Sequence, residues 1–148
     1  MKKKVAAGSI APDFIINNTD GKSMKLSDLR GKIVYLDFWA SWCGPCMGEM
    51  PSAKKLEEKY KDKNIVFLYV SIDTDADSWK KAIDKLKIDG IHMRDGEGGW
   101  TGHVATKYGV NGIPAYFLIG KDGKFVMTNT PRPSDIEVLS KEIDMLME

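Results

Sequence analysis

Two long apolar runs dominate the pattern of the chain. Residues 33–40 are almost continuously β-branched or aromatic, with Asp37 as the one charged interruption, and residues 65–72 form a second run of the same kind. A run without polar alternation is typical of a strand that is covered on both faces, as in a parallel sheet. The pattern therefore predicts two buried strands, and the first is expected to be central.

Two further stretches have the composition or spacing of helices. Residues 49–60 are rich in Lys, Glu, Ala and Leu, and Pro51 is expected to kink this helix without ending it. A second helix is expected after Asp75 or Asp77, either of which can act as its N-cap. Its inward face carries apolar residues at i, i+3, i+4 and i+7, namely Trp79, Ala82, Ile83 and Leu86.

A third helix is predicted at the C-terminus. It begins in the segment 133–137, where Ser134 and Glu137 have the spacing of a capping box. Its apolar positions, which recur on one helical face, are Ile136, Leu139, Ile143 and Leu146.

Shorter elements complete the prediction. A turn at Asp20–Gly21 joins residues 13–17 and 23–26 into an N-terminal hairpin, and Asp122–Gly123 joins antiparallel strands at 115–119 and 124–128. A short strand is expected at 90–93 and a short helix at 100–108. This order predicts an α/β fold with a mixed central sheet flanked by helices. We expect a single domain over residues 1–148, with residues 1–9 flexible.

Composition and charge narrow the function classes. The chain has 148 residues, 43% hydrophobic and 29% charged, which is typical of one domain of ordinary size. Its 22 Lys and Arg against 21 Asp and Glu leave a net charge of +1, so no field draws a nucleic acid or an anionic membrane. No apolar run approaches the roughly 18 residues of a membrane span. Two cysteines are too few for a disulfide framework.

The two cysteines carry the candidate chemistry. Cys43 and Cys46 are separated by Gly44 and Pro45, at the junction of a predicted buried strand and a helix. Unpaired amides and the positive end of the dipole at a helix N-terminus favour a thiolate, so the pKa of Cys43 is expected to fall. Cys43 would attack a substrate disulfide, and Cys46, one turn along, would resolve the mixed disulfide.

The segment 38–46, Phe-Trp-Ala-Ser-Trp-Cys-Gly-Pro-Cys, and Gly112-Ile113-Pro114 resemble the thioredoxin superfamily. Segments 12–14, 26–32 and 49–51 are similar to its TlpA/ResA branch, so the resemblance covers about residues 10–147. It implies a thioredoxin-like fold in which residues 75–100 are an insertion before a cis-proline.

The resemblance also implies a substrate-binding surface. The Ile113–Pro114 peptide bond is expected to be cis and to lie against the Cys43 sulfur, so that the Ile113 backbone receives an extended substrate segment. Trp42 is expected to cover the sulfurs and offer partners an apolar platform, together with Gly44 and Pro45. Trp39, Trp79 and Trp100 are expected to be packing residues.

Two acids are candidates for the proton chemistry. A carboxylate at Asp37 is desolvated unless it is paired, so its pKa is expected to rise. The resemblance implies that Asp37 takes the proton from Cys46, and that Tyr69 replaces the lysine that neighbours this aspartate in thioredoxin. It also implies that Glu49, three residues after Cys46, tunes the thiols. If both acids approach the thiols, repulsion holds one protonated and they titrate as a group. A solvated Asp37 paired with a surface lysine and a plain surface Glu49 are the alternatives.

Other site chemistries fit less well. A zinc site is disfavoured because Cys43, Cys46, His92 and His103 lack the spacing of zinc ligands, and the histidines are expected to be solvated or hydrogen-bonded. A thiol peroxidase of the peroxiredoxin type is disfavoured because Ala40 stands where that family has a threonine. A non-catalytic thioredoxin-like scaffold usually goes with a lost cysteine. No cofactor is expected beyond the redox-active Cys43–Cys46 disulfide.

The resemblance favours disulfide reduction as the direction of catalysis, because Gly44-Pro45 and Ile113 are choices of reducing thioredoxins. It implies a bacterial periplasm or cell envelope location after removal of a signal segment. The basic start of the chain lacks a following apolar stretch, so a cytoplasmic location is the alternative. The implied partners are an oxidised protein substrate, such as apocytochrome c or another envelope thiol protein, and a membrane electron-relay protein or thioredoxin-type reductant.

Overall fold

The computed structural model describes residues 5–95 and 103–147, and within them seven strands form one sheet, in the order β2-β1-β5-β4-β3-β6-β7. The parallel strands β3 (Ile33–Trp39), β4 (Ile65–Ser71) and β5 (Ile91–Arg94) form its interior. On one side of them, β6 (Ala115–Ile119) is antiparallel to β3, and β7 (Phe125–Met127) is antiparallel to β6. The two apolar runs are thus interior neighbours, and every residue of β3 is buried. The predicted mixed sheet is confirmed.

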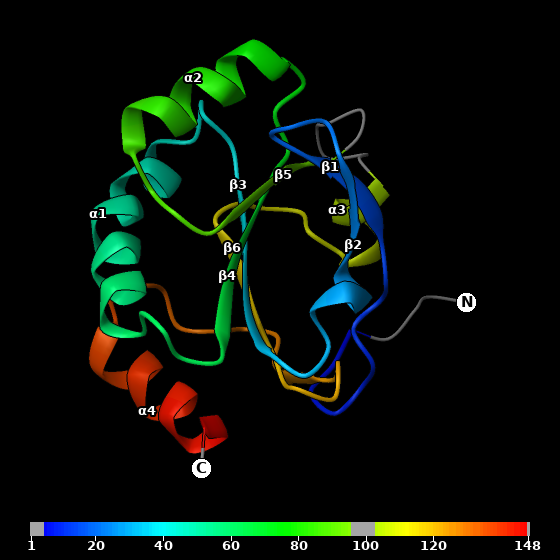
Figure 1. The fold of residues 1–148 in the computed structure, drawn as a ribbon, viewed down its shortest axis with the longest axis vertical. Helices are drawn as coiled ribbons and strands as arrows, with labels where there is room; N and C mark the ends of the chain where they lie inside the picture. Colours follow the sequence, from blue (N-terminus) through cyan, green and yellow to red (C-terminus); the bar gives the residue numbers. More distant parts are fainter. Residues whose placement is uncertain (1–4, 96–102, 148) are drawn as a thin grey trace.

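Helices cover both faces of the sheet (Figure 1). The units β3-α1-β4 and β4-α2-β5 step in the same direction across the sheet, so right-handed crossovers place α1 (Gly44–Lys59) and α2 (Ala76–Leu86) on one face. The C-terminal helix α4 (Ile136–Met147) joins that face. It contacts the end of α1, where the Tyr60 hydroxyl bonds to Asp144 at 2.8 Å. The chain returns from β5 to β6 across the other face through α3 (His103–Lys107).

An N-terminal hairpin extends the sheet beyond β5. Strands β1 (Ile15–Asn18) and β2 (Ser23–Lys25) pair with each other, β1 also pairs antiparallel with β5, and a one-turn 3-10 helix, η1 (Leu26–Leu29), follows. Gly21 adopts a φ of 78° in the connecting turn, a conformation that glycine tolerates without strain. Of the first nine residues, 1–4 lie outside the described residues, whereas Gly8 and Ser9 hydrogen-bond to β7.

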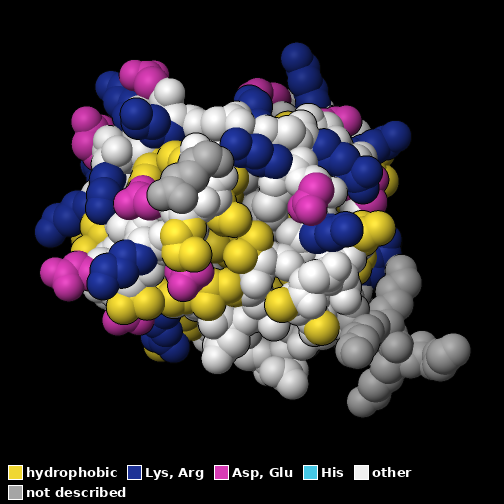
Figure 2. All heavy atoms as spheres, turned by 90° about the horizontal axis from the view of Figure 1, so that it is seen from below, with side chains coloured by type: hydrophobic (Ala, Val, Ile, Leu, Met, Phe, Trp, Pro, Cys, Tyr) yellow, Lys and Arg dark blue, Asp and Glu magenta, His cyan; other side chains and the backbone are white. Residues whose placement is uncertain are grey.

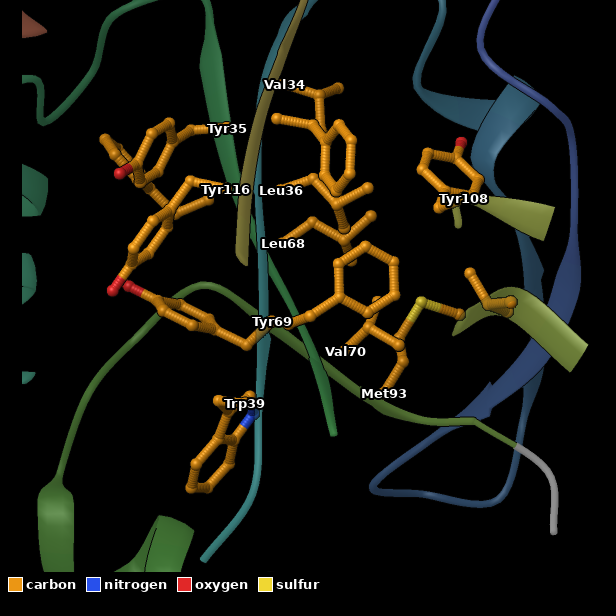
Figure 3. Packing of buried hydrophobic residues seen from close by; sticks show 14 of the residues in the cluster. Val34, Tyr35, Leu36, Trp39, Leu68, Tyr69, Val70, Met93, Tyr108 and Tyr116 are labelled. Carbon is orange, nitrogen blue, oxygen red and sulfur yellow. The ribbon is translucent and has the colours of Figure 1, made fainter. Parts of the chain in front are cut away.

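The two faces of the central strands carry different side chains (Figure 3). Val34, Leu36, Leu68, Val70 and Met93 lie on the face toward Tyr108, whereas Tyr35, Tyr69 and Tyr116 lie on the face toward α1. The first face is filled by an aromatic cluster whose ring centroids are 5.4–6.0 Å apart, made of Phe14, Phe38, Tyr108, Phe117 and Phe125. The second face, beneath α1, combines tyrosines with the buried Asp37.

The structure defines where the predicted helices begin. The first helix begins at Gly44, earlier than predicted, and continues through Pro51, as predicted. Asp75 caps α2 by accepting a hydrogen bond from the Asp77 amide. The predicted helix at 100–108 is described only from His103, because Trp100 and the rest of 96–102 lie outside the described residues.

The predicted capping box at the start of α4 is wrong. The Ser134 hydroxyl and amide both donate to the carboxylate of Glu49 on α1, at 2.8 and 2.9 Å. The helix bond from the Leu139 amide goes to the Asp135 carbonyl. Ser134 therefore joins α4 to α1, because a partner distant in the sequence takes up the polar groups that the local spacing assigned to the cap.

The surface agrees with the near-zero net charge. Figure 2, which shows the end of the molecule opposite the α1 N-terminus, has basic and acidic side chains interspersed around apolar patches. Among the described residues, none of the helices has the length and apolar content to cross a bilayer.

Asp95 stabilises the start of α3, where the chain has left β5 for the other face of the sheet. Its buried carboxylate accepts hydrogen bonds from the amides of Val104 and Ala105, at 2.9–3.0 Å, and so caps α3. We expect Asp95→Ala to lower the free energy of unfolding by about 2–3 kcal/mol, because it leaves two buried amides without an acceptor. Urea denaturation measures this loss. Asp95→Asn, which keeps one acceptor oxygen, should lose less, and equal losses for the two variants would contradict the capping role.

Candidate functional site

The two cysteines open α1. Cys43 is the N-cap, with extended backbone, and its Sγ accepts a hydrogen bond from the Cys46 amide at 3.2 Å. Gly44 and Pro45 form the first turn, where a proline lacks only an amide that would be unpaired in any case. The cysteines form a disulfide with a Cα–Cα distance of 5.2 Å. Amide donation and the helix dipole both favour negative charge on Cys43 once the disulfide is reduced.

Access to the disulfide is one-sided. Cys46 is only 1% exposed and Cys43 5%, whereas Trp42, Gly44 and Pro45 are all exposed, with Trp42 at 59%. Cys43 is therefore the more accessible of the two cysteines, and exposed residues flank it on both sides. Trp39 and Trp79 are buried, as predicted.

The loop before the cysteines is held by an acid that sequence reasoning missed. The Asp73 carboxylate accepts bonds from the Ser41 amide at 3.1 and 3.2 Å and from the Ser41 hydroxyl at 2.6 Å. Ser71, at the end of β4, donates its hydroxyl to the same carboxylate. Strand order offered a signal that could have identified Asp73. It follows the parallel strand β4 at the same edge of the sheet at which Cys43 follows β3. Asp73 thus fixes the approach to Cys43.

Asp37 lies in the centre of the sheet, on the face below α1. In the register of the strands it stands between Tyr69 of β4 and Tyr116 of β6, and it is 2% exposed. Its Oδ1 has no hydrogen-bond partner. Burial raises the pKa of the Asp37 carboxyl well above its usual range, and the Glu49 carboxylate raises it further. Tyr69 stands opposite Asp37, where the resemblance placed it.

Glu49 lies on α1 one turn after Cys46, and both of its carboxylate oxygens accept bonds from Ser134. Its charge acts on Asp37 and raises the pKa of that carboxyl. It also acts on Tyr35 and Tyr116, whose pKa values are raised chiefly by burial. The two acids are thus electrostatically coupled. Ser134 could not be identified as a partner from the sequence, because it lies 85 residues from Glu49.

The Ile113–Pro114 peptide bond is cis, as expected. Ala115 stands opposite Phe38, so Pro114 lies at the end of β3 from which the chain runs on to Cys43. Ile113 and Pro114 are both partly exposed. The structure therefore places this bond at the same edge of the sheet as the disulfide.

The histidines lie apart from the cysteines. His92 follows Tyr69 in the register, stacks on its ring at 4.9 Å and forms a hydrogen bond from Nε2 to the Ile88 carbonyl. His103 is exposed at the start of α3. In residues 5–95 and 103–147, no group of three or more His, Cys, Asp or Glu side chains is arranged to hold a metal ion.

Comparisons with known proteins agree with this geometry. Residues 6–142 match the family model described as Redoxin. The chain is 36% identical over 127 residues to the thiol-disulfide oxidoreductase ResA of Bacillus thuringiensis, covering 84% of this chain and 70% of that protein. To ResA of Geobacillus kaustophilus it is 36% identical over 138 residues, covering 92% and 77%.

A solved structure is similar along nearly the whole chain. The thioredoxin domain of a thiol-disulfide oxidoreductase from Bacteroides vulgatus superposes with a TM-score of 0.86 at 30% identity, covering 98% of this chain and 100% of that domain. The shared fold therefore includes the hairpin, the cysteine helix and the strand after the cis-proline.

The raised pKa of Asp37 predicts a pH-dependent stability. The folded protein keeps the Asp37 proton to a higher pH than the unfolded chain does. Below the pKa that Asp37 has in the unfolded chain, the residue is protonated in both states and does not destabilise the fold. As the pH rises through the pKa that Asp37 has in the folded protein, the destabilising effect of its charge increases. We expect Asp37→Asn to gain stability over the wild type across this window, by about 1.4 kcal/mol per unit of raised pKa.

Urea unfolding of the oxidised protein across a pH series measures this gain. Asp84→Asn, at an exposed position of α2, controls for the loss of one carboxylate. A stability difference between Asp37→Asn and wild type that stays constant with pH would contradict the raised pKa.

The coupling of the two acids predicts the effect of Glu49→Gln. Because the Glu49 charge raises the pKa of Asp37, its removal should lower that pKa. Carboxyl carbon NMR of oxidised protein follows the titration. Ser134→Ala is the matched control, since it removes the hydroxyl donor to Glu49 and keeps the amide donor and the Glu49 charge. It should move the Asp37 titration less than Glu49→Gln does. An unmoved titration in Glu49→Gln would show that the two carboxyls are uncoupled.

Proposed function

The chain belongs to the Redoxin family as a ResA-like thiol-disulfide oxidoreductase of thioredoxin-like fold, and from this we propose that it reduces protein disulfides through Cys43 and Cys46. The observation that carries the proposal is the disulfide at the N-terminus of α1, with the buried carboxyl of Asp37 on the sheet face below that helix.

The reaction begins with the reduced protein. The Cys43 thiolate attacks one sulfur of the substrate disulfide, a Cys43–substrate bond forms, and the other substrate sulfur leaves as a thiolate. The helix N-terminus supports this step, because the amide that now donates to Cys43 Sγ stabilises its charge. The low exposure of Cys46 favours attack by Cys43 rather than by Cys46.

Resolution of the mixed disulfide needs a base. The Cys46 thiol gives its proton to the Asp37 carboxylate and attacks Cys43 Sγ, which releases the second substrate thiolate and leaves the Cys43–Cys46 disulfide. Two electrons have then passed to the substrate. Burial and Glu49 raise the pKa of Asp37 toward that of a thiol, which reduces the free energy of the proton transfer.

Substrate binding is proposed for the exposed surface around Cys43. Trp42, Gly44 and Pro45 form its helix side, and the backbone at Ile113–Pro114 receives an extended peptide segment from the sheet side. A protein substrate fits this surface because the exposed Trp42 ring and the partly exposed backbone at Ile113–Pro114 can contact an extended segment together.

The cellular setting follows from the ResA-like branch. We place the protein in a bacterial cell envelope, with an oxidised envelope thiol protein such as apocytochrome c as substrate. A membrane electron-relay protein or a thioredoxin-type reductant returns electrons to the disulfide, since each turnover leaves Cys43 and Cys46 oxidised.

Trapping tests the proposal. Cys46→Ala keeps the attacking sulfur and removes the resolving one, so we expect it to accumulate a mixed disulfide on Cys43, which non-reducing electrophoresis and mass spectrometry of cell extracts would identify. Cys43→Ala is the control and should trap no partner. Reduction of a model protein disulfide should fall to the uncatalysed rate in both variants. Full turnover by Cys43→Ala would refute the assignment of Cys43 as the nucleophile.

A further inference from the structure

A row of polar side chains crosses the sheet beneath α1. Tyr116, Asp37, Tyr69 and His92 are successive partners in the register of β6, β3, β4 and β5, so all four side chains lie on one face. Figure 3 shows the hydroxyls of Tyr69 and Tyr116 pointing toward each other on the α1 side of the strands. The other face of the same strands is closed by apolar side chains.

Most of the unpaired polar atoms of the interior gather here. Among the described residues, seven buried side-chain nitrogen or oxygen atoms lack a hydrogen-bond partner, and five of them belong to this row and to Glu57 of α1. They are Asp37 Oδ1, Tyr69 Oη, Tyr116 Oη, His92 Nδ1 and Glu57 Oε2. Leaving such atoms unpaired destabilises a fold, and phenylalanine or leucine at these positions would avoid that effect. The concentration of these atoms points to a function other than packing.

Glu57 connects the row to the surface. It lies on α1 against Tyr69, at a place that Gly90 keeps open: a Cβ at residue 90 would lie 2.8 Å from Glu57 Oε1 and 2.9 Å from Tyr69 Cε2. Glu57 also lines an open pocket of about 380 Å³ between α1 and the starts of β4 and β5. Glu57, whose side chain is partly exposed, therefore lies between the buried tyrosine and this pocket.

Burial is the largest cause of the raised pKa values of Asp37, Tyr69 and Glu57. Burial raises the pKa of Glu57 to about 7, with a contribution from Asp89, while the Tyr69 hydroxyl opposes the rise. Burial raises the pKa of Tyr69 well above its usual range, and both Glu57 and Asp37 raise it further. Tyr69 thus stays neutral between two carboxyls that both bind protons more tightly than usual.

We propose that Tyr69 and Glu57 carry away the proton that Asp37 receives from Cys46. The Asp37 acid gives its proton to Tyr69 Oη as the hydroxyl proton of Tyr69 passes to the Glu57 carboxylate. Glu57 then loses that proton to water in the pocket, and Asp37 is again a carboxylate. The inference rests on the proposed role of Asp37 and adds Tyr69 and Glu57 as residues that act through it.

Several charged and titratable groups surround Glu57 and can influence its titration. Tyr69 of β4 and Asp89, in the turn before β5, act on Glu57, and His92 of β5 stacks on the Tyr69 ring. The remaining charged side chains of its pocket are Lys54, Glu58, Lys61, Asp62, Lys63 and Lys87.

Single-turnover kinetics with reduced protein separate the two thiol steps. An aromatic disulfide with a coloured thiolate product, dithiobis(nitrobenzoate), releases one thiolate when Cys43 attacks and a second when Cys46 resolves the mixed disulfide. The second release reports on the path because the proton moves on from Asp37 to Tyr69 and Glu57 as Cys46 attacks. We therefore expect Tyr69→Phe and Glu57→Gln to leave the first release unchanged and to slow the second about tenfold, less than Asp37→Asn does. Glu57→Gln should also remove an inflection near pH 7 from the profile of the second release.

Controls and a double variant complete the test. Tyr108→Phe, on the opposite face, and Glu142→Gln, on α4, should match wild type in both releases. Asp37→Asn combined with Tyr69→Phe should be no slower than Asp37→Asn alone, because the path acts through Asp37. Tyr69→Phe removes a single hydroxyl and keeps the ring, and Glu57→Gln is a second, partly exposed position should the first variant fold poorly.

The outcomes distinguish this inference from the proposed function. If Asp37→Asn slows the second release while Tyr69→Phe and Glu57→Gln match wild type, the exit path is wrong and the role of Asp37 stands. Additive slowing in the double variant would equally overturn the path. If Asp37→Asn leaves the second release unchanged, the proposed proton acceptor itself is wrong and the path falls with it.

Discussion

The structure depends on placing an acid where water cannot reach it. Asp37 lies in a strand whose seven residues are all buried, and the next turn of chain carries the two cysteines. An ionised carboxylate there is unfavourable, so the surroundings decide when the proton leaves. Glu49 makes its loss harder, and tyrosine neighbours add dipoles without adding charge. A surface aspartate would have no such dependence on its neighbours.

The two faces of the sheet divide stability from chemistry. One face is closed by interlocking aromatic rings from the N-terminal segment, β3, β6, β7 and Tyr108, which follows α3, and these rings bury large apolar areas. That face can stabilise the fold against the unfavourable polar row on the other. The same β3 serves both, because alternate side chains of one strand point to opposite faces.

The fold was largely predictable because its signals are local. Continuous apolar runs identified β3 and β4, helical spacing identified α2 and α4, and Asp-Gly pairs identified both hairpin turns. The supports of the site were not predictable in this way. Ser41 and Asp73 are 32 residues apart, and Glu49 and Ser134 are 85 apart. At Ser134 the local capping pattern even pointed to the wrong partner, because a carboxylate on another helix competes for the same hydroxyl.

Strand register connects the local sequence patterns with the contacts between residues that are distant in the sequence. Asp37, Tyr69, Tyr116 and His92 are ordinary residues of four predicted strands, and nothing in their local sequence joins them. Pairing of the strands places them in one line, and a slip of one residue in β4 would turn Tyr69 to the opposite face, into the aromatic and aliphatic core. The apolar pattern that selects the register therefore also sets the surroundings of Asp37. The hydrophobic core thus determines the surroundings in which the acid chemistry takes place.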